Sequence, residues 1–143
     1  MAAVGGTSET TQMYLRTVLE LEMAGVAPLR ARLRERLLHT APAISETVSR
    51  LAHDGLLLIG DQDRLLTLTP EGRRVAEAVL RKHQLAELLL TSLAGVDAAQ
   101  AHAEACNWEH VISDDVEDRL RQRLGEVPAC PYTALVAGEP PPA

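Results

Sequence analysis

The stretch HAEACNWEH, residues 102–110, contains two histidines, a cysteine and two glutamates within nine positions. If the stretch is helical, each residue turns about 100° around the helix axis. Four side chains of metal-ligand type then share one face: His102, Cys106, Glu109 and His110. Such a face is costly to bury unless its polar groups find partners, and a divalent metal ion suits convergent nitrogen, sulfur and oxygen donors. The alternative is the mixed surface of an ordinary helix.

A second pair of potential ligands lies upstream, where His83 and Glu87 are four residues apart in the segment RKHQLAE. Alone, such a pair is usually a solvated surface pair, and Cys106 alone would more often fill a core. If the helices that carry the two groups pack antiparallel across a turn at Gly95, the groups can meet and form two adjacent sites. The Cys-x-x-Cys and HExxH spacings are absent from the sequence, which argues against zinc fingers and HExxH zinc proteases.

Three helices are predicted at the N-terminal end to position these groups. The first covers about residues 8–23, and the second opens at Pro28 in the segment PLRARLRERLLH, where leucines recur at helical spacing. The third is capped by Thr40, has Pro42 in its first turn and ends at Gly55. Two short helices joined by a few residues indicate a helix-turn-helix.

A β-hairpin and further helices are predicted next. The segment LLLIGDQDRLLTLT, residues 56–69, has two apolar runs around a polar turn, which after a helix-turn-helix predicts the wing of a winged helix. Thr69 and Pro70 then start a helix that runs to about Ser92. Two more helices are expected, at about residues 97–108 and 113–124.

The composition favours a mainly helical protein, because only 2% of its 143 residues are aromatic and none is Phe. The formal net charge is −6, so any surface for nucleic acid must be a local basic patch. Such a patch lies within residues 30–53, which hold Arg30, Arg32, Arg34, Arg36 and Arg50. The sequence shows no signal peptide, membrane span or disulfide framework, so we expect a soluble cytoplasmic protein.

Three segments of this chain belong to a recognisable pattern. The stretches TTQMYLRTVLELEMAGVAPLRARL, RKHQLAELLL and HAEACNWEHVISDDVEDRL closely resemble the iron-dependent regulators of the diphtheria toxin repressor family, and the resemblance extends from about Thr10 to Leu124. It implies a homodimeric repressor that a divalent metal, normally Fe(II), activates to bind double-stranded operator DNA. An N-terminal winged helix would bind the operator, and the following helices would carry two metal sites and the dimer interface.

The resemblance also implies which residues bind metal. The primary site would consist of Met13, Cys106, Glu109 and His110. The ancillary site would consist of His83, Glu87 and His102. The two sulfur donors of the primary site suit Fe(II), Co(II) or Ni(II) better than Mg(II) or Ca(II). They point to iron sensing, with Co(II), Ni(II), Mn(II) or Zn(II) as substitutes.

The DNA-binding residues follow from the resemblance in the same way. It places phosphate contacts at Arg30, Ser45, Thr47 and Arg50. It places residues close to the bases at Thr40, Pro42 and Glu46. Glu46 stands where the iron regulators carry Gln, and a carboxylate cannot donate to a base edge and repels phosphates. We therefore expect weaker binding or a different operator.

The end of the sequence also departs from the family pattern. Relatives continue after a proline-rich linker into an SH3-like domain that adds two ligands to the ancillary site, whereas this sequence stops at Ala143. We therefore expect a mainly α fold without a C-terminal SH3-like domain, and weaker metal binding at the ancillary site. The expected parts are a winged helix-turn-helix DNA-binding domain (1–73), a helical metal-binding and dimerisation domain (74–126) and an irregular, proline-rich tail (127–143).

Three other functions are compatible with the same residues. One is a winged-helix regulator that no longer needs metal, and another is a metal-binding module whose DNA function has lapsed, as Glu46 suggests. A metalloenzyme that uses the same cluster has less support, because no general base or substrate pocket is visible beyond the ligands. We therefore do not expect an enzyme.

Overall fold

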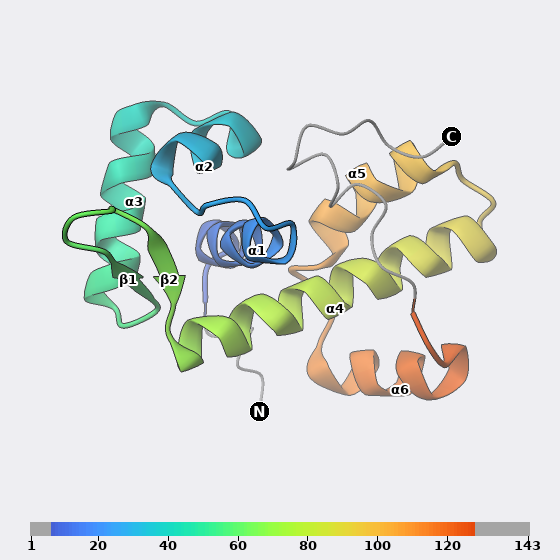
Figure 1. Ribbon diagram of the computed structural model, residues 1–143. Coiled ribbons are helices and arrows are strands. Elements are labelled where there is room, and N and C mark those ends of the chain that lie inside the picture. Colours follow the sequence, from blue (N-terminus) through green and yellow to red (C-terminus); the bar gives the residue numbers. More distant parts are fainter. Residues whose placement is uncertain (1–6, 128–143) are drawn as a thin grey trace.

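The computed structural model describes residues 7–127, which form two groups of elements joined by one long helix (Figure 1). The elements are α1 (Glu9–Met23), α2 (Arg30–Leu37), α3 (Ala41–His53), β1 (Leu57–Ile59), β2 (Leu66–Leu68), α4 (Pro70–Ser92), α5 (Ala98–Trp108) and α6 (Asp114–Leu124). The helix-turn-helix α2–α3 and the hairpin lie at one end, and α5 and α6 lie at the other. Helix α4 runs between the two ends, and α1 lies between α4 and the helix-turn-helix.

Most of the helices start where a short polar side chain caps them. A side-chain oxygen accepts a hydrogen bond from the backbone N–H three residues later at Ser8, Thr40, Thr69, Asp97 and Ser113. These caps satisfy donors that the first helical turn leaves without a partner. The predicted starts at Thr40 and Thr69 are confirmed, and so is the antiparallel hairpin, in which Leu57 pairs with Leu68.

The predicted start of the second helix at Pro28 is wrong. Helix α2 begins at Arg30, and Leu29 precedes it in an extended conformation without a side-chain cap. The carbonyl of Pro28 accepts a hydrogen bond from the Leu66 N–H at 2.8 Å. This bond holds the residues before α2 alongside β2, and the helix starts two residues after Pro28.

One hydrophobic core joins the winged helix to α4. Leu15 and Val18 of α1 and Val48 of α3 are 0% exposed, and they belong to the same buried cluster as Val75 and Val79 of α4. Apart from Tyr14, the residues of this core are Leu, Val, Ile and Ala, as the low aromatic content predicts. Helix α1 therefore packs with both the helix-turn-helix and α4.

Helix α6 is attached to α4 by two ion pairs. Arg81 Nε lies 3.0 Å from Glu117 Oε2, and Lys82 Nζ lies 2.7 Å from Asp114 Oδ1. Lys82 is 1% exposed, so its ammonium depends on this partner, because a buried charge without one is costly. The pairs fix α6 beside the half of α4 that carries His83.

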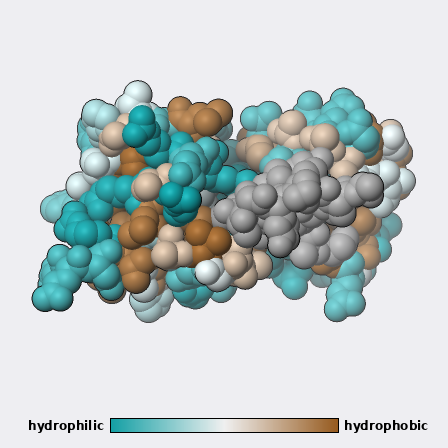
Figure 2. Space-filling model, turned by 45° about the horizontal axis from the view of Figure 1, so that its top comes forward, coloured by the Kyte–Doolittle hydropathy of each residue, from teal (hydrophilic) through white to brown (hydrophobic). Residues whose placement is uncertain are grey.

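The visible face in Figure 2 is mostly hydrophilic at both ends, with smaller hydrophobic areas between them. Trp108 is 37% exposed, so it does not belong to the hydrophobic core of the described residues. No helix within residues 7–127 is both long and apolar enough to cross a membrane. The tail predicted for residues 127–143 lies, except for Val127, outside the described residues.

Candidate metal centre and nucleic-acid interface

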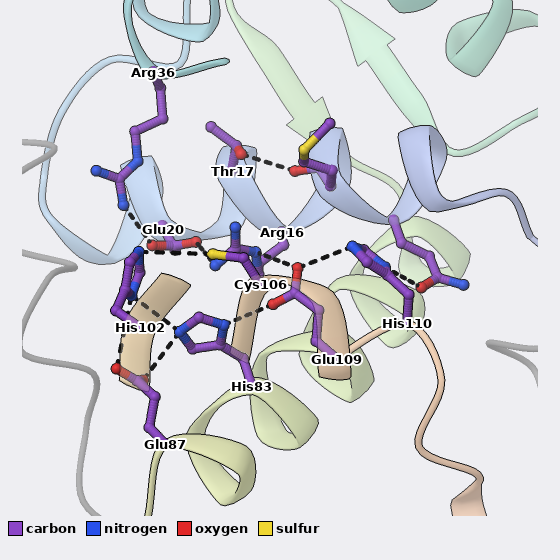
Figure 3. A network of polar contacts seen from close by, with 12 residues as sticks. Arg16, Thr17, Glu20, Arg36, His83, Glu87, His102, Cys106, Glu109 and His110 are labelled. Carbon is purple, nitrogen blue, oxygen red and sulfur yellow. Dashed lines mark hydrogen bonds and ion pairs between the residues drawn. The ribbon is translucent and has the colours of Figure 1, made fainter. Parts of the chain in front are cut away.

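The predicted metal ligands come from three helices that pack together. Met13 lies on α1, His83 and Glu87 lie on α4, and the HAEACNWEH stretch forms the C-terminal part of α5 and the turn after it. Figure 3 shows the side chains of α4 and α5 pointing toward α1. The helix ends at Trp108, and Glu109 is its C-cap with helical backbone angles. The helical geometry assumed from the sequence therefore extends through Glu109, and His110 follows in a turn.

The three residues predicted for the ancillary site converge. One ligand atom from each of His83, Glu87 and His102 lies within 4.8 Å of the others. His83 Nε2 lies 3.0 Å from Glu87 Oε1 and 3.2 Å from His102 Nδ1. Within residues 7–127, no other group of at least three His, Cys, Asp or Glu side chains has its ligand atoms this close together. Packing of α4 with α5 thus brings together the two groups that the sequence separates by a turn.

The residues predicted for the primary site lie around Glu109, which is 0% exposed. Its Oε1 lies 3.2 Å from His110 Nε2 and 3.3 Å from Arg16 Nε, and its Oε2 lies 2.7 Å from His83 Nδ1. Glu109 therefore joins the two predicted sites through His83. Cys106 Sγ contacts a residue of the ancillary group instead, because it lies 3.7 Å from His102 Nε2.

Two residues of α1 border this centre. Met13 is half-buried, and its backbone carbonyl accepts a hydrogen bond from Thr17 Oγ1 at 2.7 Å. Its neighbour Gln12 lies with Oε1 2.8 Å from His110 Nδ1. The structure thus places Glu109 and His110 in contact, while the thiol of Cys106 is in contact with His102.

The residues present fit a divalent metal. Glu109 is fully buried, and its Oε1 has ionic contacts but accepts no hydrogen bond from the described residues. Such an atom is a suitable ligand, because a metal would supply the strong partner that a buried carboxylate oxygen needs. The imidazoles of His83 and His110 contact this carboxylate, and the Cys106 thiol contacts His102. This mixture of donors is typical of sites for Fe(II), Co(II), Ni(II) or Zn(II) rather than Mg(II).

The environment of Cys106 favours a thiolate. Burial alone would raise the pKa of this thiol, but hydrogen bonds from His102 and His83 and the charge of Arg16 outweigh it and lower the pKa to about 6. The thiolate is the form that binds metals and reacts with electrophiles. Cys106 is also partly accessible, so its chemistry can be measured directly.

Alkylation of Cys106 should therefore depend on pH near 6 in the metal-free protein. Because the pKa is lowered from about 9 to about 6, the rate with iodoacetamide should rise with pH and be half-maximal near pH 6. A Cys130→Ala background removes the second thiol. Adding His102→Ala should move the midpoint upward, because the thiolate loses a hydrogen-bond donor. A midpoint near 9 before that change would contradict the prediction.

Helix α3, the second helix of the helix-turn-helix and therefore its expected recognition helix, presents its polar residues outward. Ile44, Val48 and Leu51 are buried, and the residues between them form the exposed face. The exposed residues predicted to approach DNA are Thr40, Pro42, Ser45, Glu46 and Arg50. Thr47 is half-buried and hydrogen-bonds Tyr14, so one predicted phosphate contact already has a protein partner.

Arg64 was not anticipated from the sequence as part of this surface. A hollow of about 580 Å³ lies between the hairpin and the helix-turn-helix, and its lining includes Arg30, Ser45, Ser49 and Arg64. Burial, and then the positive charge of Arg64, lower the pKa of the Arg30 guanidinium. Two arginines and two hydroxyls around one hollow suit a phosphate group. The sequence gives only a weak signal for Arg64, because it is the one basic residue in the turn and follows Asp61 and Asp63.

A second unanticipated contact joins α1 to the turn of the helix-turn-helix. Tyr14 is 0% exposed, and its hydroxyl lies 2.7 Å from His39 Nδ1. Burial raises the pKa of Tyr14 against the opposing effects of Thr47 and Arg50. Because Tyr14 follows Met13 directly, the helix that carries a predicted metal ligand also contacts the residues that lead into the recognition helix.

Comparison with known proteins agrees with this geometry. The family model "Iron dependent repressor, N-terminal DNA binding domain" matches residues 6–61, and "Iron dependent repressor, metal binding and dimerisation domain" matches residues 69–135. The chain is 52% identical over 130 residues to the diphtheria toxin repressor of Corynebacterium diphtheriae, covering 91% of this chain and 57% of that protein. It is 51% identical to the iron-dependent repressor IdeR of Mycobacterium tuberculosis, covering 91% and 56%.

Solved structures show the same arrangement of helices. The structure of the manganese regulator SloR has a TM-score of 0.74 and 31% identity, and the similarity covers 85% of this chain and 56% of that chain. The crystal structure of T. acidophilum IdeR has a TM-score of 0.72 and 26% identity over the same shares. This chain therefore spans little more than half the length of these relatives. With both family domains matched in order, the chain belongs to the family of iron-dependent repressors.

Proposed function

We propose that the chain is a DNA-binding transcriptional repressor that a divalent metal, Fe(II), activates. The observation that carries this proposal is the polar network around Glu109, which joins predicted ligands on α4 and α5 to α1 beneath the helix-turn-helix. A metal bound there would bridge the two parts of the molecule. The similar IdeR of Mycobacterium tuberculosis is an iron-dependent repressor, and this chain covers 56% of its length, so iron-dependent repression is proposed for the chain on that basis.

The proposed ligands are those of the family resemblance. A primary site would use Met13, Cys106, Glu109 and His110. An ancillary site would use His83, Glu87 and His102. The sulfur donors favour Fe(II) over Mn(II), although the similar SloR is a manganese regulator. The bound metal would supply a fixed positive charge that holds soft and hard donors together.

The chain's own residues would convert that binding into a response. Met13 lies on α1, and α1 contacts the helix-turn-helix through Tyr14 and His39. Holding Met13 against α5 therefore favours one position of α1, and with it one position of α3. If the operator binds the same arrangement more tightly, metal and DNA each strengthen the binding of the other.

The assembly and its location complete the proposal. The chain would act as a homodimer in the cytoplasm on double-stranded operator DNA, as the match to a dimerisation domain supports. Its DNA-contacting residues would be Arg30, Thr40, Pro42, Ser45, Glu46, Thr47 and Arg50, joined by Arg64. The winged-helix part would extend to residue 73, the metal-binding part from 74 to 126 and the tail from 127 to 143.

A footprinting experiment under anaerobic conditions tests the proposed function. Genomic fragments are incubated with the purified chain and Fe(II), and the same samples are repeated after a chelator is added. The proposal expects protected sites that disappear with the chelator. Protection that persists without metal would favour a metal-independent regulator, and no protection at all would leave a metal-binding module.

Replacing Glu46 with Gln should strengthen operator binding about tenfold, the size of one good base contact. Glu46 is exposed on α3, where its carboxylate repels phosphates and cannot donate a hydrogen bond to a base. Gel-shift titration of a protected fragment, at fixed salt and metal, measures the change. Glu77→Gln on α4 is the control for the altered net charge. An equal gain in operator affinity with that variant would contradict a local effect of the Glu46 carboxylate at the DNA.

A further inference from the structure

Arg16 lies between two buried carboxylates, one at the candidate metal centre and one beneath the helix-turn-helix (Figure 3). Its Nε lies 3.3 Å from Glu109 Oε1, and its Nη1 lies 3.1 Å from Glu20 Oε1. The side chains are 7% exposed for Arg16, 1% for Glu20 and 0% for Glu109. Solvent therefore screens these charges little, and each contact matters more than a surface ion pair does.

The network continues from Glu20 to the DNA-binding end. Arg36 of α2 donates a hydrogen bond from Nη2 to Glu20 Oε2 at 3.2 Å. At the other end, Glu109 Oε2 lies 2.7 Å from His83 Nδ1. An unbroken series of charged or polar contacts thus joins α4 to α2: His83, Glu109, Arg16, Glu20 and Arg36.

The same face of α1 carries the predicted ligand and the arginine. Met13, Arg16 and Glu20 are separated by three and four residues, so they lie on one side of the helix. A metal held by Met13 and Glu109 would therefore lie beside the Arg16 guanidinium. Two cations in so buried a place repel each other strongly, because neither water nor salt separates them.

The geometry points to Arg16 as a built-in counter-cation of Glu109 that an incoming metal must displace. Arg16 thereby sets the metal concentration at which the chain responds. Once displaced, the guanidinium pairs with Glu20 alone, and Glu20 then shares less of its charge with Arg36 of the helix-turn-helix. This inference rests on the proposed function, because it assumes that metal binds Glu109.

An alternative role for Arg16 predicts the opposite effect. An outer residue that merely orients a ligand strengthens metal binding, and its removal weakens the site. A displaced counter-cation weakens metal binding, and its removal strengthens the site. The sign of the change in metal affinity therefore separates the two roles, whereas a loss of stability alone would not.

Titration of the full chain with Co²⁺ under anaerobic conditions provides the test, because Co²⁺ reports thiolate coordination through its absorption. Arg16→Gln should bind Co²⁺ about tenfold more tightly than the unmodified chain, within the range typical of coupling between sites. Glu20→Gln should bind Co²⁺ more weakly, because Arg16 then has Glu109 as its one remaining carboxylate partner and is harder to displace. Arg119→Gln removes an exposed ion pair with Asp115 and should leave the affinity unchanged.

The outcomes distinguish this inference from the function on which it rests. Equal or weaker binding by Arg16→Gln would overturn the role of Arg16 while leaving the metal site intact. If Arg16→Gln does not fold, Glu20→Gln decides, and unchanged or tighter binding by that variant overturns the inference. If the unmodified chain shows no cobalt–thiolate absorption that depends on Cys106, the proposed function itself fails.

Discussion

Replacing Cys106 with Ala should abolish metal-dependent binding to the operator. The substitution removes the thiolate that the surrounding His102, His83 and Arg16 stabilise and that we propose as a ligand. Loss of an outer partner of a metal ligand typically costs 10–100-fold in affinity, so loss of the ligand itself should cost about 100-fold or more. Metal titration followed by a gel shift at matched Fe(II) concentrations measures both effects.

The other cysteine provides the control for this prediction. Cys130→Ala removes a thiol that has no proposed role, and it should keep the metal response. The fold of Cys106→Ala should also survive, because the side chain is only partly buried and is replaced by a smaller one. A Cys106→Ala chain that still responds to Fe(II) would refute the assignment of Cys106 to the primary site.

Replacing Gly72 with Ala should destabilise the whole chain by about 3 kcal/mol, the upper end of the usual cost of overpacking. Gly72 lies in the first turn of α4, where a Cβ atom would come within 2.0 Å of the backbone oxygen of Leu56. Because this oxygen belongs to the backbone, it cannot move aside as the end of a flexible side chain can. Urea denaturation of the metal-free chain measures the loss as a lower midpoint.

A second glycine separates this steric effect from backbone strain. Gly95 has a φ of +69°, but a Cβ added there would meet no atom within 4 Å. Gly95→Ala should therefore cost only about 1 kcal/mol, the usual penalty of a left-handed conformation. Equal losses for the two variants would contradict the close approach of α4 to the segment before β1.

The helices could be predicted because local signals agree with one another. Thr40 and Thr69 cap their helices and each is followed by an early proline, so both the start and the direction of α3 and α4 follow from a few residues. The start of α2 could not be predicted in this way. It depends on the contact between Pro28 and Leu66, which are 38 residues apart in the sequence.

In the candidate site too, contacts that follow from local spacing could be predicted, and contacts between distant helices could not. The meeting of His83 and Glu87 with His102 follows from helical spacing and a short turn, although metal binding by these residues stays a prediction. The contact of Arg16 with Glu109 could not be foreseen, because it joins helices far apart in the chain. A signal existed in the spacing of Met13, Arg16 and Glu20, but a sequence does not say which side chain lies opposite a helix face.

Helix α4 is shared by the hydrophobic core of the winged helix and by the candidate metal centre. Its first turns, with Val75 and Val79, fill the core of the winged helix, and the next turns carry His83 and Glu87. A cut after residue 73 would divide this helix, so a recombinant DNA-binding fragment would lose part of its own interior. Metal that stabilises one end should raise the melting temperature of both ends in a single transition.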